Sequence, residues 1–167
     1  TGNLGDSYLG LKALSNKVKF KNKDKLFFVD KYYKPELPLN LTKYLLKFAN
    51  SSIDVSDGLI DDLAKMINRQ SLSFHLFENK IPVSNKLSNF IKKQRLNKIN
   101  LISNGDDYQV LFTADIKKAR IIHKASKATG IKITKIGKIV SGKDRSLIFD
   151  EKGKQIRAKS KGYIHRF

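Results

Sequence analysis

The feature that most constrains the fold is an acid-rich stretch over residues 53–63, in which four Asp fall within nine positions. The alternation at its start predicts a short strand over 51–56, with Asp54 and Ser56 on the same face. Apolar residues then recur at helical spacing, which predicts an amphipathic helix over 57–69. Its apolar positions are Leu59, Ile60, Leu63, Met66 and Ile67. The stretch therefore predicts a strand-to-helix corner that projects carboxylates and a hydroxyl.

Two interpretations of this corner are open from the sequence. Carboxylate oxygens suit a hard cation such as Mg²⁺, and the N–H groups that begin a helix can contact a phosphate. Alternatively, Ser56 or Asp57 is only a helix cap, and Asp61 and Asp62 only match the helix dipole. Asp54 fits that second interpretation poorly, because a carboxylate inside an apolar strand needs a partner.

Composition narrows the function classes. The net charge of +19 raises the possibility of nucleic-acid binding, but only 6 of the 34 basic residues are Arg and the Lys are scattered. We therefore expect no dedicated nucleic-acid partner, and infer instead a positive field that attracts phosphorylated substrates. The absence of Cys favours a reducing compartment, so we expect a cytoplasmic protein. No apolar run reaches membrane-spanning length, which predicts no membrane partner.

The second informative stretch covers residues 101–112. The pair Asn104 and Gly105 predicts a turn, and a strand leaves it from Val110. Two adjacent acids, Asp106 and Asp107, stand at this junction, where they are either functional or ordinary loop polarity.

The rest of the pattern predicts an α+β fold. Helices are expected after a cap at Asp6 or Ser7, after Ser84, and over 115–129 with Gly130 as the stop. Further strands are expected over 71–77, 131–140, 147–150 and 155–158. We therefore expect a mixed β-sheet of about five or six strands with helices packed on it.

Four blocks together resemble thiamine-monophosphate kinase, in the order and at about the spacing of that family. They are residues 1–7, 53–63, 104–108 and 161–163. The central block is shared with the wider aminoimidazole-ribonucleotide synthetase superfamily. The resemblance spans nearly the whole chain and implies that residues 1–167 are a single C-terminal domain. Because the chain does not begin with Met, we expect the family's N-terminal ATP- and Mg²⁺-binding domain to be absent from it.

The resemblance also implies roles for five residues. Asp54 and Asp57 would ligate Mg²⁺, and Ser56 would contact a phosphate of ATP. Asp106 would contact the thiamine monophosphate substrate, and Tyr163 would line the thiamine pocket. No side chain is assigned as a chemical catalyst.

The chain departs from the family pattern at two places. The family sequence Gly-Gly-Glu-Asp-Tyr-Glu is replaced over residues 104–109 by one with Asp106 in place of Glu and Gln109 in place of the second Glu. A family segment Arg-Pro-x-Pro-Arg corresponds to residues 34–39, which have one more residue between the prolines and no Arg.

The function implied is transfer of the γ-phosphoryl group of ATP to thiamine monophosphate, giving thiamine diphosphate, in an enzyme that is a homodimer when intact. We expect this chain alone to have negligible kinase activity, because half of the family's site is missing. The alternatives are a truncated, non-catalytic binding module and, less favoured, a basic nucleic-acid-binding domain.

Overall fold

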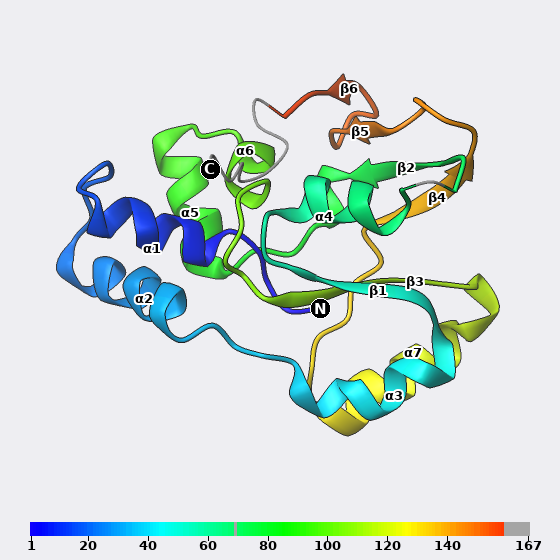
Figure 1. Cartoon of the computed structure of the whole chain (residues 1–167). Coiled ribbons are helices and arrows are strands. Elements are labelled where there is room, and N and C mark those ends of the chain that lie inside the picture. Colours follow the sequence, from blue (N-terminus) through cyan, green and yellow to red (C-terminus); the bar gives the residue numbers. More distant parts are fainter. Residues whose placement is uncertain (69, 159–167) are drawn as a thin grey trace, which may run out of the picture.

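A computed structural model describes residues 1–68 and 70–158. Within these residues the fold is α+β, as expected, and the strands form two sheets (Figure 1). The strands are β1 (Ala49–Val55), β2 (Leu72–Phe77), β3 (Gln109–Ala114), β4 (Gly137–Ser141), β5 (Leu147–Phe149) and β6 (Gln155–Ile156). β1 and β3 form an antiparallel pair, while β4-β2-β5-β6 is a mixed sheet in which β2 and β5 are parallel.

Helices surround both sheets. They are α1 (Asp6–Leu14), α2 (Asn22–Tyr33), α3 (Thr42–Phe48), α4 (Leu59–Met66), α5 (Asn85–Gln94), α6 (Lys98–Ile102) and α7 (Ala119–Thr129), with short 3₁₀ turns η1 (Leu39–Leu41), η2 (Glu78–Lys80) and η3 (Ile116–Lys118). In Figure 1, α1 and α2 lie side by side at one end, α3 and α7 lie together below the β1–β3 pair, and α4 stands beside the mixed sheet. No helix among the described residues is both long and apolar enough to cross a bilayer.

The core consists of three apolar clusters. The largest joins α4 to both sheets through residues such as Val55, Leu63 and Phe74. A second cluster joins α1, α2 and α5, and a third joins α3 and α7 to the end of the β1–β3 pair. The corner between β1 and α4 is therefore anchored by the largest cluster, because Val55 and Leu59 on either side of it are buried.

Two details of the fold differ from the sequence-based prediction. The strands divide between two sheets rather than one, and the strand expected over 131–140 forms only from Gly137 to Ser141. The physical reason is that the residues before Gly137 pack into two different apolar clusters. Ile133 packs in the cluster of α3 and α7, and Ile136 packs in the largest cluster. The carbonyl of Lys132 accepts a hydrogen bond from the N–H of Gly2 (2.9 Å). Such a segment buries apolar side chains without a partner strand.

Candidate functional site

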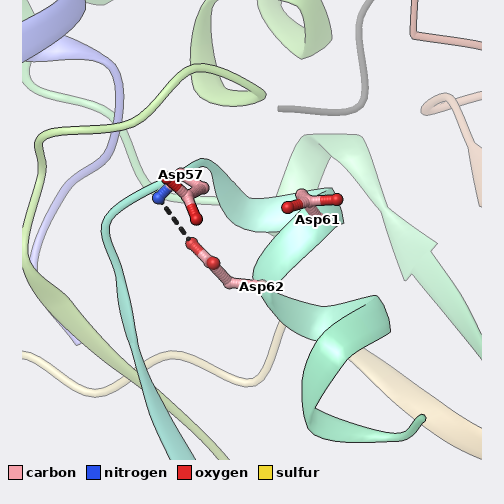
Figure 2. A group of neighbouring side chains, drawn as sticks. All are labelled: Asp57, Asp61 and Asp62. Carbon is pink, nitrogen blue, oxygen red and sulfur yellow. Dashed lines mark hydrogen bonds between the residues drawn. The ribbon is translucent and has the colours of Figure 1, made fainter. Parts of the chain in front are cut away.

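The corner between β1 and α4 is shaped by Asp62. One of its carboxylate oxygens accepts hydrogen bonds from the backbone N–H groups of Ser56, Asp57 and Gly58, each at 3.0 Å. Figure 2 shows the Asp57 bond and the position of Asp62 on the first turns of α4. Asp62 is buried with 1% of its surface exposed, so the accepting carboxylate is shielded from water. A side chain from inside the helix thus holds the turn that precedes it.

This arrangement corrects the expected capping. The N-cap position is Gly58, whose φ of 126° is accessible mainly to glycine, and no side chain caps the helix there. The expectation that Ser56 or Asp57 caps the helix is therefore wrong. The N–H groups of these residues are bound by Asp62, so they are not available for direct phosphate contact as the sequence had indicated.

The expected faces of β1 are confirmed by its burial. Exposure alternates along the strand, with Ile53 half-buried, Asp54 exposed and Val55 buried. Asp54 lies opposite Val110 of β3 in the antiparallel pair. The Asp54 carboxylate therefore projects from the solvent face of the strand, just before the corner.

The loop over residues 104–108 packs directly on this corner. The N–H of Asp106 donates to the carbonyl of Ser56, and the N–H of Tyr108 donates to the carbonyl of Val55, both at 2.9 Å. Gly105 is required here, because a Cβ on it would lie only 1.7 Å from the Ser56 carbonyl oxygen. Two sequence blocks about fifty residues apart therefore form one unit.

The backbone of this loop is unusual. Asp106 and Tyr108 adopt positive φ values of 69° and 50°. Asp tolerates this left-handed conformation, whereas a bulky residue such as Tyr rarely does. Conformations of this kind persist where surrounding contacts enforce them, and they concentrate at functional sites.

Negative charge gathers beside this loop. The pKa of Asp106 is raised by burial and by the charge of Asp57. The pKa of the Tyr108 hydroxyl is raised by burial and then by the charges of Asp106, Asp54 and, more weakly, Asp57. The charges of Asp54, Asp57 and Asp106 therefore all act on the Tyr108 hydroxyl, and the charge of Asp57 also acts on Asp106.

Three Asp at the corner also meet the geometric requirement for cation binding. Ligand oxygens of Asp57, Asp61 and Asp62 all lie within 4.8 Å of one another, and Figure 2 shows the three side chains turned towards a common space. The Nζ atom of Lys65 contacts the same group: it pairs closely with Asp57 and lies 2.7 Å from Asp61 and 3.5 Å from Asp62. Hydrogen bonds to Asp57 and Asp61 raise the pKa of Lys65, which keeps it charged.

The N-terminal block joins the same unit through Asp107. This carboxylate is buried and accepts from the N–H of Gly5 (2.7 Å) and of Ser7 (3.5 Å), at the start of α1. A second buried carboxylate, Asp6, accepts from the hydroxyl of Ser84 (2.7 Å). Burial raises the pKa of Asp107 to about 8 and that of Asp6 to about 6. These two acids are structural links between segments.

The departure from the family pattern at Gln109 is accommodated by the fold. Gln109 is buried, accepts from the hydroxyl of Thr1 (2.8 Å) and donates to the carbonyl of Glu36 (2.8 Å). It therefore ties the loop to the first residue and to the segment between Pro35 and Pro38.

Two cavities of about 760 and 660 Å³ lie nearby, the first lined by Val55 and Leu59 and the second by Asp6 and Asp107. Neither is lined by the charged group of Asp54, Asp57 and Asp106. The fourth sequence block, with Tyr163, lies outside the described residues.

Sequence reasoning identified Asp54, Ser56, Asp57 and Asp106, but it missed Lys65. The sequence does indicate an ion pair here. Lys65 stands four residues after Asp61 and three after Asp62, the spacings at which helical side chains meet. The buried role of Asp107 had no such local signal, since its partners are about a hundred residues away.

Comparison with known proteins gives a consistent result. The chain is 35% identical over 167 residues to the thiamine-monophosphate kinase of Buchnera aphidicola subsp. Schizaphis graminum, with 99% of this chain and 51% of that protein covered. A solved structure of "AaThiL complexed with AMPPCP and TMP" superposes with a TM-score of 0.77 and 28% identity, over 99% of this chain and 50% of the other.

The fold is also found in a more distant protein. E. coli HypE, a hydrogenase maturation protein, superposes with a TM-score of 0.70 at 13% identity, over 98% of this chain and 48% of HypE. These similarities confirm the expected fold class of the aminoimidazole-ribonucleotide synthetase superfamily. No protein-family model matches the chain. The chain spans about half the length of the curated relatives it matches.

Proposed function

We propose that this chain, which belongs to the thiamine-monophosphate kinase family, forms the C-terminal half of an enzyme that transfers the γ-phosphoryl group of ATP to thiamine monophosphate. The single observation that carries this proposal is the contact between the corner after β1 and the loop over 104–108. That contact lays the loop with Asp106 directly on the turn that carries Ser56, between Asp54 and Asp57, and a site for two phosphorylated ligands requires such closeness.

The residues present fit Mg²⁺. Carboxylate oxygens are the ligands that this ion prefers, and the corner offers several within a few ångströms. Asp54 and Asp57 are the proposed ligands, as the family resemblance implies. Of the two, Asp57 belongs to the close oxygen group, in which Asp62 is committed to the backbone of the turn. When bound, Mg²⁺ supplies positive charge that offsets the repulsion between phosphate groups.

The proposed roles of Ser56, Asp106 and Tyr163 are contacts with the two substrates. The Ser56 hydroxyl, at the turn between the two acids, would hydrogen-bond a phosphate of ATP and fix its orientation. Asp106 would contact thiamine monophosphate from the facing loop, and Tyr163 would line the thiamine pocket. Phosphoryl transfer needs mainly such positioning and charge stabilisation, so no side chain of this chain has to form a covalent intermediate.

We propose further that this chain needs a second half of similar size to act. It matches only about half of each relative, and neither of the two cavities described is lined by Asp54, Asp57 or Asp106. A homodimeric assembly of the intact enzyme and a cytoplasmic location belong to the same proposal. The absence of Cys is consistent with that location.

A hybrid enzyme tests this function. This chain would replace the matching half of the E. coli thiamine-monophosphate kinase, a relative 29% identical over 166 residues. With ATP, Mg²⁺ and thiamine monophosphate, the hybrid should form thiamine diphosphate, and the isolated 167-residue chain should form almost none. In the hybrid, Asp57→Asn should abolish the product, whereas the matched control Asp144→Asn, in the turn before β5, should retain it.

The outcome also decides between this function and a non-catalytic binding module. A hybrid that folds, assembles like its E. coli parent and binds ATP, yet forms no thiamine diphosphate, would contradict the proposal and favour the module. The Asp106 and Gln109 departures motivate that alternative.

A further inference from the structure

Lys65 occupies a position that the proposed function does not explain. Its Nζ atom lies among three carboxylates, paired closely with Asp57 and at 2.7 and 3.5 Å from Asp61 and Asp62. The helix enforces this contact, because Lys65 follows Asp61 and Asp62 by four and three residues on α4. The Asp57 carboxylate reaches the Nζ atom of Lys65 from the turn before the helix.

A cation between these carboxylates reduces the repulsion among their negative charges. Three carboxylate oxygens within 4.8 Å of one another repel strongly, and one of the three carboxylates is almost fully buried. The Asp62 oxygen that binds the turn is already satisfied by three N–H groups, so the remaining charge faces Lys65. Lys65 therefore offsets charge that would otherwise destabilise the corner.

The Lys65 side chain is also exposed and flexible enough to move away from the carboxylates into solvent. Its side chain is 47% exposed, whereas those of Asp57 and Asp61 are 24% and 34% exposed. A Lys ammonium sits on a flexible four-carbon stem, and exposed ion pairs hold such a group only weakly. An ammonium and a divalent ion within about 4 Å of each other repel even at the effective dielectric constant of a protein surface. The two cations therefore exclude each other at Asp57.

We propose that Lys65 is the resident cation of the corner and competes with a divalent metal ion for Asp57, so that it sets the metal affinity of the site. This inference rests on the proposed function, because it takes Asp57 as a metal ligand. Lys65 is then a regulator of metal occupancy: it stabilises the empty corner and swings into solvent when the metal binds.

Binding of Mn²⁺, used as a paramagnetic substitute for Mg²⁺, tests the competition. Electron paramagnetic resonance of free Mn²⁺ would be recorded during titration of the 167-residue chain and of three variants. Lys65→Met removes the competing charge and should tighten binding by about tenfold, equivalent to about 1.4 kcal/mol. Lys65→Arg retains the competing charge, so its Mn²⁺ affinity should stay well below that of Lys65→Met.

Lys47→Met is the matched control. It removes the same charge from α3, at the opposite end of β1 from the corner, and should leave the Mn²⁺ affinity unchanged. Thermal unfolding without metal gives a second readout. Lys65→Met should lower the melting temperature in metal-free buffer, and Mn²⁺ should restore more of it than in the wild type, because the ion replaces the missing charge.

Each outcome is decisive. Tighter binding by Lys65→Met, or binding by that variant alone, supports the competition. Equal binding by wild type and Lys65→Met overturns it, while leaving the metal site of the proposed function intact. Weaker binding by Lys65→Met also overturns it. Binding by neither protein overturns both the competition and the proposed metal site in this chain.

Discussion

Replacing Asp62 by Ala tests the physical basis of the corner. The substitution removes the acceptor for three N–H groups, each 3.0 Å from the same oxygen: that of Gly58, which is buried, and those of Ser56 and Asp57, which are part-buried. A buried donor left without an acceptor costs about 1–3 kcal/mol. Because relaxation lets water reach part of the turn, we take values near the low end and expect a total loss of about 3–4 kcal/mol in the free energy of unfolding.

Urea unfolding measures this loss. The chain has six Tyr and no Trp, so far-ultraviolet circular dichroism and Tyr fluorescence are the suitable signals. With a denaturant slope of about 2 kcal/mol/M, Asp62→Ala should lower the midpoint by nearly 2 M. The neighbouring Asp61→Ala is the matched control. Asp61 is a third exposed and pairs only with Lys65 among the contacts described, so its loss should cost less than about 1 kcal/mol.

The stability losses of Asp62→Ala and Asp61→Ala together test whether Asp62 holds the turn. If Asp62→Ala unfolds within about 1 kcal/mol of the wild type, then Asp62 does not hold the turn. Equal losses in Asp62→Ala and Asp61→Ala would mean that general charge balance, rather than the three N–H bonds, stabilises the corner.

Three further predictions concern the segments around the corner. Gly105→Ala should destabilise the fold by about 2 kcal/mol or more in thermal unfolding, because its Cβ would overlap the Ser56 carbonyl; an unchanged melting temperature would contradict that packing. Stability should fall as pH rises from about 4 to 8, because burial raises the pKa of Asp107 from 3.8 to about 8 and the folded state alone retains that proton. Asp107→Asn should flatten this fall in urea titrations across that range, and an equally steep curve would count against it. Ser84→Ala should cost about 1–2 kcal/mol, because Ser84 caps α5 through the Leu87 N–H and donates to Asp6; a loss of only a few tenths would rule this out.

The sequence predicted the elements that depend on local patterns. The helix after Ser84 begins as expected, with that hydroxyl accepting from Leu87, and the helix that ends at Thr129 stops at Gly130 in the left-handed conformation. Capping and glycine signals act within a few residues, so the sequence alone reveals them. The alternating faces of β1 follow from the same local logic.

The sequence did not predict features that depend on distant partners. Ser56 or Asp57 was expected to cap α4, but the N-cap is Gly58 and Asp62 from inside the helix binds the turn, because the choice of cap depends on which side chain the turn geometry favours. The buried Asp107 reaches Gly5 across about a hundred residues. No periodicity or spacing encodes such a contact, and only the assembled fold shows it.

The candidate site was predictable in its acids but not in its arrangement. Asp54, Asp57 and Asp106 stood out because acids are scarce in a chain of net charge +19. Their gathering depends on Gly105, whose missing side chain lets the loop lie against Ser56. Asp54 and Asp57 are proposed metal ligands, which metal binding can test, and Asp106 is a proposed substrate contact.

Paramagnetic broadening by Mn²⁺ in amide NMR spectra tests the central claim most directly. If the surface formed by Asp54, Asp57 and Asp106 binds divalent cations, substoichiometric Mn²⁺ should first erase the amide signals of these residues and of Ser56. The signals of the exposed acids Asp144 and Glu151, which lie on the turns flanking β5, should persist. Broadening that begins at such distant acids, or that leaves residues 54–57 and 106 untouched, would contradict the account.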